Sequence, residues 1–306
     1  MTPDPIARAL GAFGTRRAAL DFGFFKLNVP GAGLALLVDL IVRRETGLVQ
    51  VRASVHAPSH AGVHWREQPL AVARFHAPGR SAVLASAGAS WLGPRGSLGT
   101  VGPVSWELTF RATGAPLLPL PGFLEPLRPV DMFLSSAPEV RFDGEITVAG
   151  AHFAVKDAPG MVSSYHGRRL PSRWTWISCN AFDRPDVAVE CMTARTRLFG
   201  LAGAEVDTGY FHLRGGGTAE TLVAPLGGNI TVAREDGRLV VTARRRGSGR
   251  THRLVCGAPS VAWHDLGEGI RNTLVGDCEL EGVARATGTA GLEERGGGDV
   301  QVPVPE

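Results

Sequence analysis

The chain has 306 residues, which fits one large or two medium domains and allows a substantial core. Its 40 glycines and 21 prolines, with only 20% charged residues, indicate many turns without the composition of a disordered chain. The formal charge of +3, from 32 basic and 29 acidic residues, implies no general field for polyanions, so nucleic acid is not an expected partner.

The first 110 or so residues predict a short helix or flexible lead-in at residues 2–12 and then a succession of strands. Residues 48–55 show the clearest alternation, with apolar side chains facing one way and polar side chains the other. A strand with one apolar face and one solvent-exposed polar face is typical of an antiparallel sheet that covers a core on a single face. The strands predicted here are 20–27, 33–43, 48–55, 70–75, 81–85 and 104–110.

Residues 115–138 carry six prolines, so they can form neither a long helix nor a central strand. Their leucines and phenylalanines predict a semi-extended segment that packs over the first barrel or across a junction. No helical period persists beyond it, and the tail from Arg295 is predicted to be frayed. The strands predicted after this segment are 139–146, 152–155, 173–182, 187–192, 208–213, 220–223, 229–234, 239–243, 251–256 and 274–284.

The four cysteines, Cys179, Cys191, Cys256 and Cys278, form no close pair of metal-binding or redox type, and no secretory signal precedes them. We therefore expect free, buried thiols in a protein of the reducing cytoplasm. The longest apolar run has about ten residues, far short of the ~20 that a membrane-spanning helix needs. Transient contact with a membrane surface stays open.

Two other clusters suggest sites that the sequence does not support further. His56, His60 and His64 would share one face of a helix as a metal site, but Pro58 and Gly62 argue against that helix and favour a polar loop, so no metal is assigned. The basic run at residues 244–250 brackets a Gly-Ser-Gly turn and predicts an exposed hairpin turn.

No known catalytic motif stands out either. Phosphate-binding loops, zincin motifs and nucleophile elbows are absent from the sequence. Cys179 and His166 would supply a nucleophile and a base, but nothing supplies the third group that would orient them.

Residues 161–182 (MVSSYHGRRLPSRWTWISCNAF) hold the densest set of informative side chains. Two indoles, a phenyl ring and two small polar groups on one face are typical of a pocket wall, although tryptophans on strands also serve as plain core filling. Read as a strand from Arg173, the alternation places on that face Trp174, Trp176, Ser178, Asn180 and Phe182.

Residues 142–182 contain a G-x-I-x-x-x-G hairpin, a short strand, a small motif ending in Gly167, and then a proline and a W-x-W strand. Together with the hairpin at residues 199–225, this pattern makes the region of about 104–225 similar to the tocopherol cyclase family, which is related to the carotenoid hydratases and to lipocalin-like Diels–Alderases. At several positions this chain has the residue that is expected for the family. These residues are Gly167, Pro171, Trp174, Trp176, Cys179, Asn180 and Phe182.

The resemblance implies an all-β fold of two tandem lipocalin-like antiparallel barrels or sandwiches, with a ligand cavity in or between them. We expect domains at residues 1–165 and 166–306, with a boundary inside 115–138 as the alternative. It also implies a cofactor-independent activity on a large apolar isoprenoid or polyketide-type molecule. Indole faces such as those of Trp174 and Trp176 would stabilise a developing carbocation by about 2 kcal/mol each when desolvated.

The chain departs from the family at residues 163–167 (SSYHG), where tocopherol cyclases tend to show Glu-Lys-Asn-Trp-Gly and hydratases Asp-His-Asn-Trp-Gly. The acidic residue and the tryptophan are both missing. Protonating an unactivated alkene needs a carboxylic acid that burial keeps neutral, so another carboxyl is required. Glu190, in the apolar run VAVECM, is one candidate, with Glu205 and Glu107 as others; the competing interpretation of Glu190 is a structural ion pair with an arginine.

These observations predict a cofactor-independent cyclase or isomerase, and they leave two alternatives. One is a lipocalin-like carrier that binds a similar apolar molecule without chemistry, and the other is a terpenoid double-bond hydratase with a replacement acid. The sequence does not predict the oligomeric state. In the enzyme hypothesis Trp174, Trp176 and Phe182 shape the cavity, Asn180 and Tyr165 orient polar atoms, and His166, or Glu190 as the acid, moves a proton.

Overall fold

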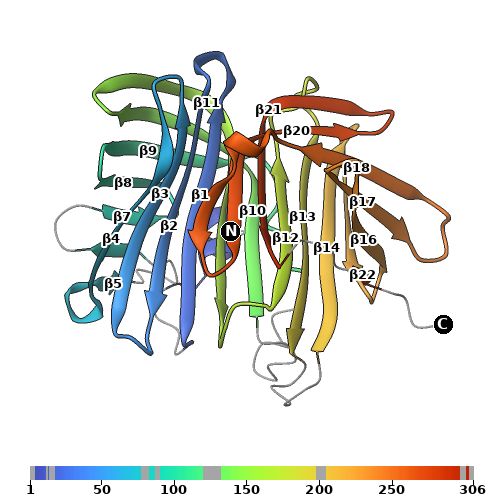
Figure 1. The fold of residues 1–306 in the computed structure, drawn as a ribbon, viewed down its shortest axis with the longest axis horizontal. Coiled ribbons are helices and arrows are strands. Elements are labelled where there is room, and N and C mark those ends of the chain that lie inside the picture. The colour runs from blue at the N-terminus through green and yellow to red at the C-terminus, as the bar shows by residue number, and fades with distance from the viewer. Residues whose placement is uncertain are drawn as a thin grey trace. The chain divides into compact units, whose positions relative to one another are not determined.

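A computed structural model describes residues 4–11, 13, 18–76, 83–86, 90–119, 132–197, 205–296 and 301–302. Its single described α-helix is α1 (Pro5–Leu10), and nearly all other regular structure is antiparallel strand (Figure 1). The chain divides into two compact units, Met1–Gly122 with Met132–Leu170 and Phe123–Asp131 with Pro171–Glu306. The predicted all-β fold of two barrel-like sheets is confirmed, since one sheet forms a half-barrel and the other a nearly closed barrel. The domain division expected at residues 165 and 166 stays a prediction.

The first unit is built on one sheet with the strand order β4-β3-β2-β1-β11-β10-β9-β8-β7-β6-β5. Two short 3-10 helices, η1 (Pro30–Ala32) and η2 (Leu70–Val72), lie in its connections. Its strands are β1 (Leu20–Val29), β2 (Leu34–Arg43), β3 (Leu48–Ala57), β4 (His60–Pro69), β5 (Arg74–His76), β6 (Val83–Ser86), β7 (Ser90–Gly93), β8 (Gly96–Val101), β9 (Val104–Ala112), β10 (Met132–Val148) and β11 (Ala151–Gly167).

The second unit has the strand order β15-β14-β13-β12-β21-β20-β18-β17-β16-β22, with β19 paired to β20. A 3-10 helix, η5 (Ser260–Ala262), precedes β19. Its strands are β12 (Arg173–Cys179), β13 (Ala188–Arg197), β14 (Glu205–Gly215), β15 (Thr218–Ala224), β16 (Gly228–Glu235), β17 (Arg238–Arg245), β18 (Thr251–Gly257), β19 (His264–Gly267), β20 (Ile270–Leu280), β21 (Ala284–Arg295) and β22 (Gln301–Val302).

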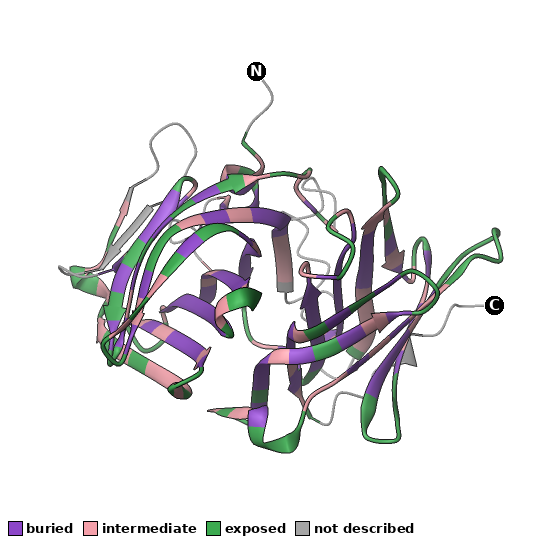
Figure 2. Cartoon of the chain, turned by 90° about the horizontal axis from the view of Figure 1, so that it is seen from above, coloured by how far each residue is buried: buried purple, intermediate pink, exposed green. Residues whose placement is uncertain are grey.

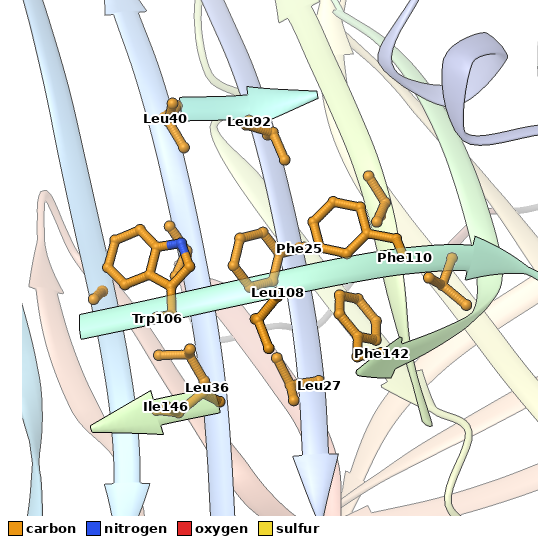
Figure 3. Close-up of a cluster of buried hydrophobic side chains, with 14 of the residues drawn as sticks. Phe25, Leu27, Leu36, Leu40, Leu92, Trp106, Leu108, Phe110, Phe142 and Ile146 are labelled. Atoms are coloured by element: carbon orange, nitrogen blue, oxygen red, sulfur yellow. The ribbon is translucent and has the colours of Figure 1, made fainter. Parts of the chain in front are cut away.

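Side chains fill the concave side of the first sheet. Phe25, fully buried on β1, lies at its centre, with ring centroids of Phe110, Phe142 and Trp106 at 5.5, 5.8 and 6.4 Å (Figure 3). Helix α1 places Ile6, Ala9 and Leu10 in the same cluster. Helix α1 therefore helps to cover the apolar face of the first sheet, as expected for a sheet that must bury that face.

The second barrel is filled in the same way. Its buried cluster takes Ile177 and Cys179 from β12, Cys191 from β13, Phe211 from β14 and Leu292 from β21, among other side chains. Buried positions recur along strands of both sheets (Figure 2), and β12 and β13 are buried at nearly every position, so both of their faces are covered. These side chains form the hydrophobic core of the second unit.

Several predicted element bounds are wrong. The strand expected at 152–155 is β11, which runs on through the motif at 163–167, and the strand expected at 274–284 is two strands joined by a turn at 281–283. Residues 70–72 form η2 and not the start of a strand. His60 and His64 lie on β4 and not in a polar loop, with their Nε2 atoms 2.8 Å apart. Part of the segment predicted at 115–138 lies outside the described residues.

Two of the four cysteines are not free thiols. Cys256 on β18 and Cys278 on β20 are directly opposed in the antiparallel pairing, with their Cα atoms 4.4 Å apart, and they form a disulfide. The expectation of free thiols is thus wrong for this pair, because a separation of 22 residues carries no information on strand register. It is confirmed for Cys179 and Cys191, which are free and buried.

Reducing the disulfide is expected to lower the free energy of unfolding by about 2–4 kcal/mol, because the bond restricts the unfolded chain. Urea unfolding followed by circular dichroism, with and without a reductant, would measure this loss. The double variant Cys256→Ala/Cys278→Ala should be less stable than the oxidised protein and insensitive to the reductant. Equal stability of the oxidised and fully reduced protein would contradict the prediction.

None of the described helices has both the length and the apolar composition that a membrane crossing requires. Among all residues that the structure describes, no group of three or more His, Cys, Asp and Glu side chains is arranged to hold a metal ion.

Candidate active site

The W-x-W strand β12 presents its two indoles on the side opposite the core. Ile177 and Cys179 point into the hydrophobic cluster of the second barrel, so the alternation turns Trp174, Trp176 and Ser178 to the other face. These three side chains are nevertheless buried, the indoles being 4% and 5% exposed. Both faces of β12 are therefore buried.

The predicted face is only partly assembled. The strand ends at Cys179, so the alternation stops there, and Phe182 packs in the core cluster together with Ile177. Asn180 follows the end of the strand and is partly buried. Trp174 donates its Nε1–H to Glu293 Oε1 at 3.1 Å, and the guanidinium of Arg295 lies 5.5 Å from the centroid of the indole.

A row of polar side chains crosses four neighbouring strands on this face. In the antiparallel register Ser178 lies opposite Glu190, Glu190 opposite His212, and His212 opposite Thr221. Directly opposed residues share a face and have Cβ atoms about 5 Å apart. Ser178, Glu190 and His212 are buried, while Thr221 is exposed on the edge strand β15. The row therefore leads from the solvent to a buried carboxyl.

Glu190 is the buried carboxyl of this row, at 1% exposed. It accepts a hydrogen bond of 2.7 Å from the hydroxyl of Tyr210, which belongs to the adjacent row opposite Met192. Burial, and then the negative charge of Glu190 and the hydrogen bond to it, raise the pKa of Tyr210 well above its ordinary value. Tyr210 thus remains a hydrogen-bond donor to Glu190 across the neutral range.

His212 is the second titratable group of the row. Its Nδ1 lies 2.8 Å from Thr221 Oγ1, and its buried Nε2 has no hydrogen-bond partner among the described residues. Burial, and then the positive charge of Arg214, lower the pKa of His212 to about 4. The imidazole is therefore neutral at pH 7.

This shift predicts that acid destabilises the protein partly through His212. As the pH falls below about 6.5 the unfolded chain takes up a proton on this histidine, whereas the folded chain does so only near pH 4, so the folded state loses roughly 2 kcal/mol by pH 5. Urea unfolding at pH 7 and pH 5 should therefore show a larger loss for the wild type than for His212→Gln. Equal losses in the two proteins would contradict the prediction.

The predicted pair Tyr165 and His166 lies in the first unit, on consecutive positions of β11 and hence on opposite faces. The Tyr165 hydroxyl donates to the carbonyl oxygen of Arg169 at 2.6 Å. His166 stacks on Phe133, with ring centroids 5.3 Å apart. It also lies directly opposite Asp21 in the β1–β11 pairing, and both side chains are buried. An imidazole beside a carboxyl is an arrangement suited to proton transfer.

Ser163 stands where the family resemblance expects an acidic residue. It is fully buried on β11, and its hydroxyl donates to the carbonyl oxygen of Ser135 at 2.7 Å. The same face of this sheet carries Lys26, which is fully buried, and Asp39, which accepts from Arg52 Nε at 2.8 Å. The sequence signal for these buried charges was a polar residue inside an apolar strand.

The other two carboxyls considered from the sequence do not share the burial of Glu190. Glu107 on β9 and Glu205 at the start of β14 are both exposed to solvent. Tyr210 and His212 escaped the sequence analysis because their role depends on which strands pair and in which register. The one available signal was that both occupy alternate positions of a predicted strand.

The fold and these two buried polar faces define a protein of tandem lipocalin-like units. Residues 109–220, from β9 to β15, match the model of the tocopherol cyclase-like family, so the resemblance to that family is confirmed over this region. The matched region includes Ser163, the W-x-W strand, Glu190 and His212. Comparison with curated proteins gives no match.

The solved structures that match this fold include two that are covered over most of their length. A protein designated AttH from Nitrosomonas europaea superposes with a TM-score of 0.58 at 11% sequence identity, covering 94% of this chain and 95% of that one. Kievitone hydratase from Nectria haematococca superposes with a TM-score of 0.52 at 13% identity, covering 90% and 88%. At these identities the similarity establishes the fold.

Proposed function

We propose that this chain is a cofactor-independent enzyme that protonates a carbon–carbon double bond of a large apolar isoprenoid or polyketide-type substrate and thereby cyclises or isomerises it. The observation that carries the proposal is the buried Glu190 carboxyl, which Tyr210 hydrogen-bonds and which lies one row from Trp176. The match to the tocopherol cyclase-like family supports the substrate class.

The reaction is redox-neutral, so side chains alone can supply its steps. In its protonated form the Glu190 carboxyl gives its proton to one alkene carbon, and the positive charge develops on the neighbouring carbon. A hydroxyl oxygen of the same substrate then bonds to that carbon and releases its proton, which closes a ring. In isomerisation the cation instead loses a proton from an adjacent carbon. In either case the carboxylate left on Glu190 takes a proton back.

Tyr210 and Trp176 favour this step over proton transfer to solvent. The Tyr210 hydroxyl donates to one carboxyl oxygen and so fixes which oxygen carries the transferable proton. Trp176 offers an indole face that stabilises a nearby cation. Trp174 is less suited, because the guanidinium of Arg295 already lies beside its ring.

The remaining predicted site residues keep distinct roles in the proposal. His166, opposite Asp21, is the second candidate for moving a proton. The Tyr165 hydroxyl donates to the carbonyl oxygen of Arg169. To orient a substrate carbonyl or phenol, it would have to break this hydrogen bond and donate to the substrate instead. Asn180 would orient a polar atom near the end of β12, and Phe182 supports the wall from within the core.

Hydration of the same double bond is the second candidate function. The row beside Glu190 contains Ser178 and His212, which could hold a water molecule next to the cation, and kievitone hydratase shares the fold. The carrier hypothesis has less support, since the described interiors of both units are filled by buried clusters.

Mass spectrometry of turnover in D2O separates these functions. The full-length protein would be incubated with a panel of polyprenyl-substituted quinols and polyenes, together with any apolar molecule that co-purifies. Cyclisation or isomerisation through carbon protonation gives a product of unchanged composition that carries one deuterium on carbon. Hydration adds the mass of one water. Tight binding of a panel member without any product would overturn the proposal in favour of a carrier.

A further inference from the structure

One end of the second barrel has a cavity of about 170 Å³ that the proposed reaction does not use. Its lining residues come from β16, the β16–β17 turn, β17, the end of β18, η5, and strands β20 and β21. We propose that this cavity binds a small organic carboxylate with a flat apolar body. The residues that carry the argument are Arg234, Leu239, Cys256, Trp263, Arg271 and Leu292.

Two arginines give one side of the cavity a positive charge. Glu294, only 1% exposed, accepts hydrogen bonds from both Arg234 and Arg271 and so holds the two guanidinium groups in place. Two positive charges against one negative charge leave a net charge of +1. Each guanidinium has five N–H donors, so donors remain that can meet a carboxylate.

Two nearby acids offset this charge only in part. Asp265 lies opposite Arg271 in the β19–β20 pairing and keeps its negative charge, since its Oδ1 accepts the neutral backbone N–H of Gly267 at 2.7 Å, but it is exposed to solvent, which screens it. Glu235, next to Arg234 in sequence, pairs with Arg253. The charge of the arginine pair therefore remains available to a ligand.

The other walls are apolar. The Arg271 guanidinium lies 4.9 Å from the centroid of the Trp263 ring, which fixes the plane of both groups. Leu239, Leu292 and the disulfide sulfur of Cys256 line the remaining surface and belong to the barrel core. A ligand that meets both surfaces has an anionic end and a flat hydrocarbon body.

The volume limits the size of this ligand. A cavity of 170 Å³ holds about five or six waters at ~30 Å³ each, and it is smaller than the 300–1,000 Å³ that drug-sized ligands occupy. An aromatic monocarboxylate fits this size, whereas a large isoprenoid does not. The site is therefore distinct from the buried row around Glu190, and its test is independent of the proposed function.

Titration calorimetry with benzoate and with its neutral isostere benzamide tests the proposal on the full-length protein. We expect benzoate to bind more tightly than benzamide, and Arg271→Gln to weaken benzoate binding about tenfold or more while changing benzamide binding little. Arg285→Gln is the matched control, since Arg285 lies on β21 outside the cavity lining with its ion pair to Glu279, and it should bind benzoate as the wild type does.

A second variant keeps the proposal testable if Arg271→Gln does not fold. Ser260 lines the cavity and is exposed on η5, so Ser260→Phe should block the opening without touching either arginine. It should abolish benzoate binding with unchanged thermal unfolding. Benzoate binding no tighter than benzamide, or wild-type benzoate affinity in both Arg271→Gln and Ser260→Phe, would overturn the proposal.

Discussion

Replacing Glu190 with glutamine is expected to lower turnover by about 10²–10⁴-fold, the range for loss of a general acid. Glutamine keeps the size of the side chain, and its amide oxygen can still accept the hydroxyl of Tyr210, but it has no proton to give to carbon. Substrate affinity should change little, because the lost interaction is made in the transition state. Single-turnover kinetics and equilibrium binding, measured on the same substrate, would separate the two quantities.

The controls for Glu190→Gln use the same chemical change elsewhere in the unit. Glu220→Gln on β15 alters a partly buried carboxyl that pairs with Arg245 and His252 outside the row, and it should retain wild-type turnover. Tyr210→Phe should give a smaller loss than Glu190→Gln, since the acid itself remains. If Glu190→Gln keeps full turnover while His166→Ala loses it, the proton donor is the His166 pair in the first unit.

The sequence predicts individual strands better than their partners. Alternation in residues 48–55 and in the W-x-W strand correctly separates one face from the other, because the period of 2 is a local property. Phe182 shows the limit of this inference, since the strand ends three residues earlier and the ring returns to the core. The small motif at 163–167 continues β11, and the buried hydroxyls of Ser163 and Ser164 donate to backbone carbonyl oxygens outside the motif.

The candidate site could be predicted only in part for the same reason. Glu190 stands out because a carboxyl inside an apolar run must be either paired or functional. Tyr210, His212 and Asp21 give no such signal, because the candidate role of each depends on which residue lies opposite it on the paired strand. The strand register also brings Cys256 opposite Cys278, which allows the disulfide to form. Strand pairing is set by packing of the whole sheet, which no local pattern encodes.

Replacing Phe25 with alanine is expected to lower the free energy of unfolding by about 3–5 kcal/mol, the range for removing a large aromatic side chain from a packed core. Phe25 is fully buried and lies among three aromatic rings (Figure 3), so the neighbours cannot easily fill the space. Urea unfolding would measure the loss. Phe153→Ala provides the matched control, because Phe153 is only partly buried against the same cluster, and its loss should be clearly smaller.

The size of this loss also bears on what the half-barrel does. In a carrier, Phe25 would line a chamber that is empty without ligand, and truncating it would remove few contacts and cost little stability. In the structure the next residue, Lys26, points to the opposite face, which also carries the buried side chains of Asp39 and Ser163. A large loss for Phe25→Ala therefore supports a solid interior that holds these polar faces in position, whereas a loss below about 1 kcal/mol would favour a hollow, ligand-binding barrel.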